Sequence, residues 1–112
     1  MCNNCEIVKA AFEGAKNQPR LNYPPLHAML SEMLKQRRLE LYAGDCPFDE
    51  MTEVLEKETH YTVCSYLRCS ECGTIFFFGA CIRGEPKFKE INDITEEAID
   101  KMLWGREGEH FK

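Results

Sequence analysis

The sequence contains no long hydrophobic run. None of its 112 residues lies in a stretch that approaches the roughly 18 apolar residues of a membrane-spanning helix. The first residues also lack the basic region followed by an apolar segment that is typical of a secretory signal. We therefore expect a cytoplasmic protein, and the length predicts one domain covering residues 1–112.

The sequence also lacks an excess of basic residues. Its formal net charge is −5, which disfavours nucleic acid as a partner because phosphates are bound by Lys and Arg. Six acids fall in residues 45–58 and five in residues 90–100. These runs are either solvated faces of short helices or a surface that attracts a cationic protein. In the second case the candidate partner-binding residues are Asp45, Asp49, Glu50, Glu53 and Glu56, followed by Asp93, Glu96, Glu97 and Asp100.

A catalytic motif is lacking as well. The sequence has no glycine-rich phosphate-binding loop. Its three histidines, His27, His60 and His110, are not spaced in a way that pairs one of them with a nucleophilic cysteine. We therefore expect surface histidines and a protein that is not an enzyme.

Cysteine, by contrast, is abundant. The odd number of seven, in a reducing compartment, favours free thiols or metal ligands over disulfides. Four of the seven form two Cys-x-x-Cys pairs, and four thiolates are the ligand set of a structural Zn²⁺ site. A glycine after the second pair permits a positive φ, which turns backbone amides toward the sulfurs. The sequence thus predicts a structural zinc ion bound by Cys2, Cys5, Cys69 and Cys72.

Other roles for the thiols remain open. Cys64 and Cys81 flank the second pair, so they could complete the zinc site in place of a terminal pair that takes no part. Alternatively, they are small buried side chains that lie opposite each other across a hairpin. Redox chemistry at the second pair would need a βαβ context, whereas the sequence after Cys72 is typical of a strand. Cys46 is expected to be a thiol at a helix start, without chemistry.

The hydrophobic pattern predicts helices first and strands later. Apolar residues at helical spacing indicate a helix over residues 4–16 and a second one from Leu26. Between them, Pro19, Pro24 and Pro25 predict an extended connection. A short strand over residues 39–43 and a helix after Pro47 follow.

The second half of the chain predicts three strands, over residues 60–68, 74–82 and 87–91. The link between the first two is too short for a parallel crossover, so the sheet is antiparallel. A last helix starts near Asp93 or Thr95, with Asp93 and Glu96 resembling a capping box, and ends at a Gly105 cap. The predicted class is α+β: N-terminal helices packed on a small antiparallel β-meander, and a closing C-terminal helix.

Two segments, YLRCSECGTIFFFGACIRGEPKFKEI at residues 66–91 and LWGREG at residues 103–108, resemble small bacterial immunity proteins of contact-dependent and other polymorphic toxin systems. The resemblance covers about the last fifty residues. It implies a cytosolic domain that binds a cognate toxin, in many cases a nuclease, and blocks its active site. An acidic domain suits that role, because carboxylates can occupy the positions of substrate phosphates.

A second class of function stays open beside this one. The chain could be a zinc-ribbon-like adaptor that binds nucleic acid or another protein. In that case Phe76, Phe77 and Phe78 would stack on bases, with Arg68 and Arg83 near the phosphates. A steep salt dependence of binding to generic RNA or DNA would favour the adaptor.

Overall fold

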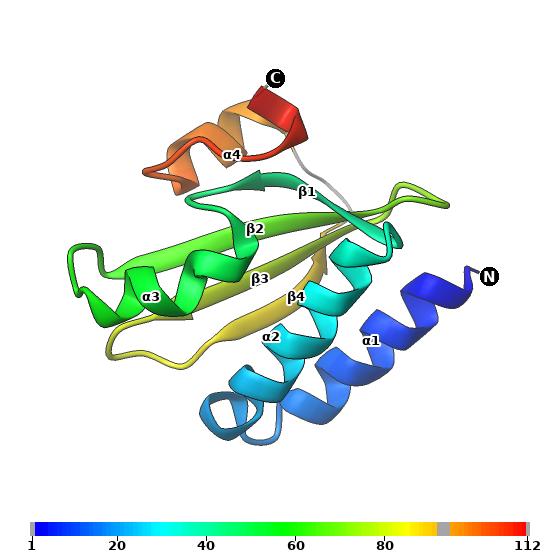
Figure 1. The fold of residues 1–112 in the computed structure, drawn as a ribbon, viewed down its shortest axis with the longest axis horizontal. Helices are drawn as coiled ribbons and strands as arrows, with labels where there is room; N and C mark the ends of the chain where they lie inside the picture. The colour runs from blue at the N-terminus through cyan, green and yellow to red at the C-terminus, as the bar shows by residue number, and fades with distance from the viewer. Residues whose placement is uncertain (1, 92–94, 112) are drawn as a thin grey trace.

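A four-stranded antiparallel sheet in the order β1-β2-β3-β4 forms the centre of the protein (Figure 1). The structure is a computed structural model that describes residues 2–91 and 95–111. The predicted α+β class is confirmed, since helices precede the meander and a helix follows it. The elements are α1 (Asn3–Ala15), α2 (Pro19–Lys35), β1 (Leu39–Gly44), η1 (Phe48–Glu50), α3 (Met51–Glu56), β2 (Thr62–Cys69), β3 (Ile75–Cys81), β4 (Lys87–Ile91), α4 (Glu96–Met102) and η2 (Glu109–Phe111).

The two central strands, β2 and β3, form a long hairpin. They pair without interruption from Thr62 opposite Cys81 to Arg68 opposite Ile75. Side chains of β3 are buried on both faces of the sheet, as its continuous apolar sequence predicts for a central strand. β4 pairs with β3 and leaves Lys87 and Lys89 exposed, which confirms the predicted edge strand.

Alternation along β3 separates the three consecutive phenylalanines. Phe76 and Phe78 belong to the larger core, which the sheet forms with α1, α2 and α3. Phe77 belongs to a smaller core on the other face, beneath Ile99 of α4. All three rings are at most 6% exposed. The hypothesis that the three rings together stack on bases is therefore wrong, because Phe76 and Phe78 have no exposed ring face and Phe77 lies on the opposite face of the sheet.

Helix α2 begins at Pro19, so the predicted extended connection and the predicted helix start at Leu26 are wrong. Pro19 occupies the first helical turn, where a missing N–H breaks no helical bond. Pro24 and Pro25 lie inside the helix on its exposed side, where water can solvate the carbonyls that they leave unpaired. Packing opposes the local penalty, because Tyr23 stacks on Phe78 with ring centroids 5.3 Å apart. No helix among the described residues combines the length and the apolar character needed to cross a membrane.

The C-terminal helix is shorter than predicted. α4 starts after Thr95, whose hydroxyl accepts a hydrogen bond from the Ala98 N–H at 3.1 Å. The predicted capping box depends on Asp93, which lies outside the described residues. The predicted cap at Gly105 is wrong, because the helix ends at Met102 and Leu103 is extended. Gly105 instead packs against the backbone of Asp45, where a Cβ would overlap the Asp45 carbonyl.

Candidate functional site

The structure brings both Cys-x-x-Cys pairs together, at one end of the sheet. The start of α1 places Cys2 and Cys5, and the β2–β3 turn places Cys69 and Cys72. All four Sγ atoms lie within 4.8 Å of one another. Sulfurs about 2.3 Å from a central zinc ion would be about 3.8 Å apart in a tetrahedron, so this spacing is compatible with a metal site.

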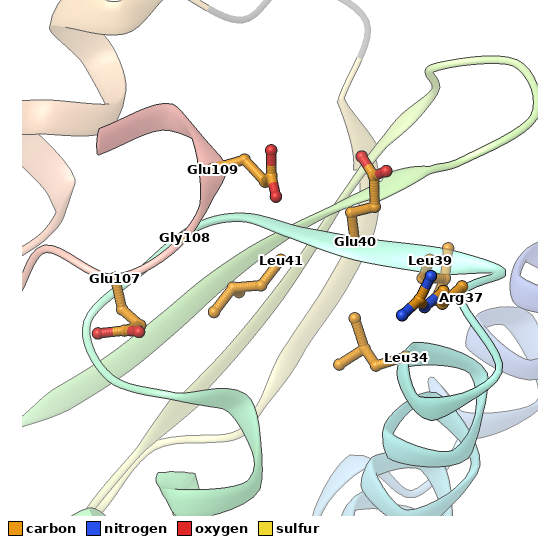
Figure 2. A pocket seen from close by; sticks show the side chains of 8 residues that line it. All are labelled: Leu34, Arg37, Leu39, Glu40, Leu41, Glu107, Gly108 and Glu109. Atoms are coloured by element: carbon orange, nitrogen blue, oxygen red, sulfur yellow. The ribbon is translucent and has the colours of Figure 1, made fainter. Parts of the chain in front are cut away.

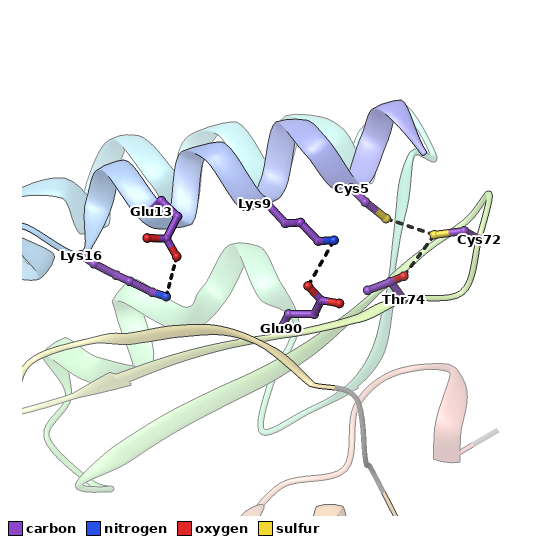
Figure 3. Close-up of polar contacts among 7 residues, drawn as sticks. All are labelled: Cys5, Lys9, Glu13, Lys16, Cys72, Thr74 and Glu90. Carbon is purple, nitrogen blue, oxygen red and sulfur yellow. Dashed lines mark hydrogen bonds and ion pairs between the residues drawn. The ribbon is translucent and has the colours of Figure 1, made fainter. Parts of the chain in front are cut away.

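Two close sulfur contacts join α1 to the hairpin. Cys5 Sγ lies 3.0 Å from Cys72 Sγ, and Cys2 Sγ lies 3.4 Å from Cys69 Sγ (Figure 3 shows the first). None of these cysteines forms a disulfide. The alternative in which the terminal pair takes no part is therefore contradicted by the geometry.

The orientation of each pair follows from local structure. Cys5 lies on the buried side of α1 with Val8 and Phe12, so packing of this side on the sheet turns its sulfur toward the hairpin. In the turn, the Cys69 N–H donates to the Thr74 carbonyl at 2.9 Å. Gly73 has a φ of +81°, which confirms the positive φ predicted after the second pair.

A single carbonyl connects the two halves of the cysteine cluster. The Arg38 carbonyl accepts hydrogen bonds from the Ser70 N–H at 3.1 Å and from the Asn4 side-chain amide at 3.3 Å. Ser70 Oγ also donates to the Arg37 carbonyl at 2.7 Å. Asn4 and Ser70 are not among the site residues that the sequence predicts. Their positions between the cysteines of the two Cys-x-x-Cys pairs could have indicated that they belong to the site.

The thiols of the cluster differ in acidity. A hydrogen bond with the Thr74 hydroxyl, 3.1 Å from Cys72 Sγ, lowers the pKa of Cys72 to about 6, and Cys5 adds to this shift. Burial raises the pKa of Cys5. Of the two thiols, Cys72 therefore loses its proton more readily than Cys5. A divalent metal would replace the thiol protons, since thiolates are the form that binds metals.

The other three cysteines do not join the cluster. Cys64 pairs with Gly79 and Cys81 with Thr62, so the prediction that they lie directly opposite each other is wrong. Cys64 is part of the smaller core, and burial raises its pKa to about 12. Cys46 is buried next to η1, and burial raises its pKa to about 11. These side chains fill space, as a small apolar residue would.

Asp45, predicted to contact a partner, is instead a buried structural residue. It is 5% exposed. Its Oδ2 accepts from the Cys64 N–H at 2.8 Å, and its Oδ1 accepts from the N–H groups of Trp104 at 2.7 Å and Gly105 at 3.0 Å. Burial raises the pKa of Asp45, although these three donors oppose the shift. Asp45 thus fixes the C-terminal segment to β2 and is unavailable to a partner.

The remaining candidate acids lie on two different faces. Asp49, Glu50, Glu53 and Glu56 are exposed on η1 and α3, which pack into the larger core with α1 and α2. Glu96, Glu97 and Asp100 are exposed on α4, which packs over the smaller core on the opposite face of the sheet. Asp93 lies outside the described residues. The two predicted acidic runs therefore do not form one continuous surface.

A groove beside β1 contains further acids. Glu40, Glu107 and Glu109 line a pocket of about 430 Å³ whose apolar part includes Leu34 and Leu41 (Figure 2). An adjoining pocket of about 310 Å³ shares Leu34, Leu41 and Glu107 and adds Asp49. We refer to the two pockets together as the acidic groove.

Positive charges border the acidic groove at the end of α2, where Arg37 and Lys35 line it. Glu40 is neutralised by Arg68, whose guanidinium approaches it at 2.6 Å. Asp49, Glu107 and Glu109 form no ion pair with the residues that the structure describes. These three carboxylates therefore dominate the negative charge of the acidic groove.

Glu107 and Glu109 could not be predicted as site residues, because a long-range contact places them beside β1. The Gly44 N–H donates to the Glu107 carbonyl at 2.7 Å, and the Glu107 N–H donates back at 2.9 Å. Gly108 has a φ of +116°, and its Cα approaches the carbonyls of Leu41 and Tyr42 closely enough to exclude a Cβ. The alternating sequence Glu107-Gly108-Glu109 is the one local feature that could have indicated an acidic site here.

Two of the three histidines that the sequence predicts to lie on the surface pack against neighbouring side chains instead. The His27 ring stacks on Phe48 with centroids 4.4 Å apart, and its Nε2 lies 2.7 Å from the Phe48 carbonyl. The His110 side chain is 9% exposed and lies 3.8 Å from an oxygen of Asp100. His60 is exposed, as predicted, and stacks on Trp104. His27 thus helps to attach η1 to α2.

Comparisons with known proteins do not place the chain in a family. No protein-family model, curated protein or solved structure matches it. The resemblance to immunity proteins therefore stays a prediction, and the function has to be argued from the cysteine cluster and the charged surfaces.

Proposed function

We propose that the chain is a non-catalytic protein-binding domain whose first helix is fastened to the sheet by a structural Zn²⁺ ion. The observation that carries this proposal is the convergence of four cysteine sulfurs from segments 67 positions apart in the sequence. Four thiolates complete the coordination of zinc, so no position remains for water or substrate. The ion would therefore act on stability and shape, and not on a reaction.

The metal content of the protein tests the zinc site. Protein purified under reducing conditions should contain one zinc per chain by native mass spectrometry. The double variant Cys69→Ser/Cys72→Ser should contain none, because two ligands remain. Cys81→Ser, which alters a cysteine outside the cluster, is the matched control and should keep the metal. A metal-free wild-type protein, or zinc retained by the double variant, would contradict the proposal.

The partner that we propose is a cationic toxin domain. The acidic surface consists of Asp49, Glu50 and Glu53 together with Glu107 and Glu109 of the acidic groove. Asp49 joins the two parts, because it belongs to η1 with Glu50 and lines the acidic groove with Glu107. Exposed carboxylates of this kind steer a basic partner and fix its orientation. The resemblance of the C-terminal half to immunity proteins supports a toxin as that partner.

Charge reversal tests the acidic surface. We expect Asp49→Lys/Glu50→Lys/Glu53→Lys to weaken capture of the protein encoded by the adjacent gene by at least about tenfold. Glu96→Lys/Glu97→Lys/Asp100→Lys makes the same charge change on the opposite face and should leave capture unchanged. Equal effects of the two triple variants would refute this surface. Binding to generic RNA with a steep salt dependence would favour the adaptor class instead.

A further inference from the structure

The face of the sheet that carries α4 contains an apolar cavity of about 650 Å³. It lies between α4 and the strands β2, β3 and β4, and its floor includes Cys64, Tyr66, Phe77 and Gly79. Pockets for small molecules in proteins have volumes of about 300–1,000 Å³ and mostly apolar walls. The cavity therefore has the size and the lining of a ligand site, and it lies on the face opposite α3.

The absence of a side chain at Gly79 makes room for the Phe77 ring in the floor of the cavity. A Cβ at Gly79 would lie 2.7 Å from two ring carbons of Phe77, so the Phe77 ring occupies the space beside this glycine. The helix above is short, with α4 ending at Met102. Figure 1 shows α4 on the β1 side of the sheet, away from β4. As a result, α4 leaves the β4 side of this face open.

Lysines surround the mouth of the cavity. Lys87 and Lys89 come from β4 and Lys101 comes from α4. Lys89 Nζ lies 5.6 Å from the centroid of the Phe77 ring, so its charge stands directly over the apolar floor. Lys101 is paired with Glu97 at 3.1 Å. Within residues 2–91 and 95–111, no carboxylate forms an ion pair with Lys87 or Lys89.

The neighbouring acid of β4 does not neutralise these lysines. Glu90 points to the other face of the sheet, where Lys9 of α1 lies 3.3 Å from it (Figure 3). The cavity thus combines an apolar floor with two positive charges on one side, in a chain whose net charge is −5. A ligand complementary to this arrangement has an apolar tail and a negatively charged head.

We propose that this cavity binds a free alkyl carboxylate of the size of decanoate. The alkyl chain lies over Tyr66 and Phe77, and the carboxylate accepts hydrogen bonds from the amino groups of Lys87 and Lys89. Burial of the alkyl chain supplies the non-directional part of the affinity. The two lysines select a ligand with an anionic head group over one with a cationic head group. The site is separate from both the acidic surface and the cysteine cluster, so the proposal does not depend on the proposed function.

Titration of the ¹⁵N-labelled protein, as purified under reducing conditions, with monomeric decanoate tests the site by NMR. Saturable shifts of the amides of Phe77, Gly79 and Lys89, with one decanoate per chain, are expected. Decyltrimethylammonium has the same tail and a positive head, and it should bind at least about tenfold more weakly. Absence of saturable shifts at these amides, or equal affinity for the two probes, would overturn the proposal.

Substitutions on the edge strand provide the second test. Lys87→Glu/Lys89→Glu should reduce the affinity for decanoate at least about tenfold, whereas Lys87→Arg/Lys89→Arg should retain it. Lys16→Glu/Lys57→Glu makes the same charge change at exposed positions outside the cavity and should bind like the wild type. Wild-type affinity in a folded Lys87→Glu/Lys89→Glu variant would refute the proposal. The proposal would also be refuted if the protein sedimented with phosphatidylglycerol vesicles but did not bind decanoate.

Discussion

Asp45 illustrates why a charged residue cannot be assigned to a surface from its sequence neighbours alone. It opens an acidic run whose other members are exposed, yet its carboxylate is buried against three backbone N–H donors. Two of those donors, Trp104 and Gly105, are about sixty positions away, so no local pattern reveals them. Residues such as Asp49, whose environment is local and solvated, were placed correctly on the surface.

Replacement of Asp45 by Ala should destabilise the fold by at least about 2 kcal/mol, because it leaves buried N–H groups without an acceptor. Release of the buried charge, the same desolvation that raises the pKa of Asp45, offsets part of the loss. Urea unfolding of the zinc-loaded protein measures the change. Asp49→Ala, at an exposed acid four positions later, should stay within about 0.5 kcal/mol of the wild type. Equal stability of the two variants would show that Asp45 does not hold the C-terminal segment.

At the scale of elements, α1, β1, β2, β3 and β4 could be predicted because their side-chain periods are local. The start of α2 could not, because Pro24 and Pro25 are unfavourable inside a helix and only packing against the sheet compensates them. The end of α4 could not be predicted for a related reason. The local sequence favours a helix cap at Gly105, whereas a glycine is required there by the close approach to Asp45, which belongs to another part of the chain.

Pro24→Ala tests whether packing holds α2 helical against its own sequence. Alanine restores an N–H that can donate to the Arg20 carbonyl, so the variant should be more stable by about 1 kcal/mol. Thermal unfolding should show a higher midpoint. Pro19→Ala is the matched control, since the first helical position needs no N–H donor, and its midpoint should change little. A lower midpoint for Pro24→Ala would mean that the proline stabilises the helix start.

At the scale of the whole molecule, the cysteine cluster was predictable and the acidic groove was not. Each cysteine pair has a local spacing with a known chemical meaning, so only the meeting of the two pairs had to be inferred. The acidic groove arises from the contact between Gly44 and Glu107, which has no spacing signature. Long-range contacts of this kind decide where polar residues from separate segments gather.

Removal of the proposed zinc ion should loosen α1 and leave the sheet in place. Beyond the cysteines, α1 is attached by burial of Val8, Phe12 and Ala15 and by the hydrogen bond from Asn4 to the Arg38 carbonyl. It is also attached by the ion pair of Lys9 with Glu90, whose side chains are 41% and 32% exposed. An ion pair with this exposure contributes at most about 1 kcal/mol. A zinc ion that binds only the folded cluster should contribute about 3 kcal/mol or more at saturating metal.

Hydrogen exchange with and without a chelator measures this difference along the chain. Amides of α1 should lose protection when zinc is removed, while those in the centre of β2 and β3 should keep most of theirs, because the pairing of these two strands does not involve the metal.

 The pairing of these strands, from Thr62 opposite Cys81 to Arg68 opposite Ile75, is made by backbone groups alone. Cys2→Ser/Cys5→Ser should reproduce the loss in α1 without a chelator, and added zinc should not restore its protection. Cys81→Ser should behave like the wild type in both conditions. Uniform loss of protection over α1 and the sheet would instead show that the ion stabilises the whole fold as one cooperative unit.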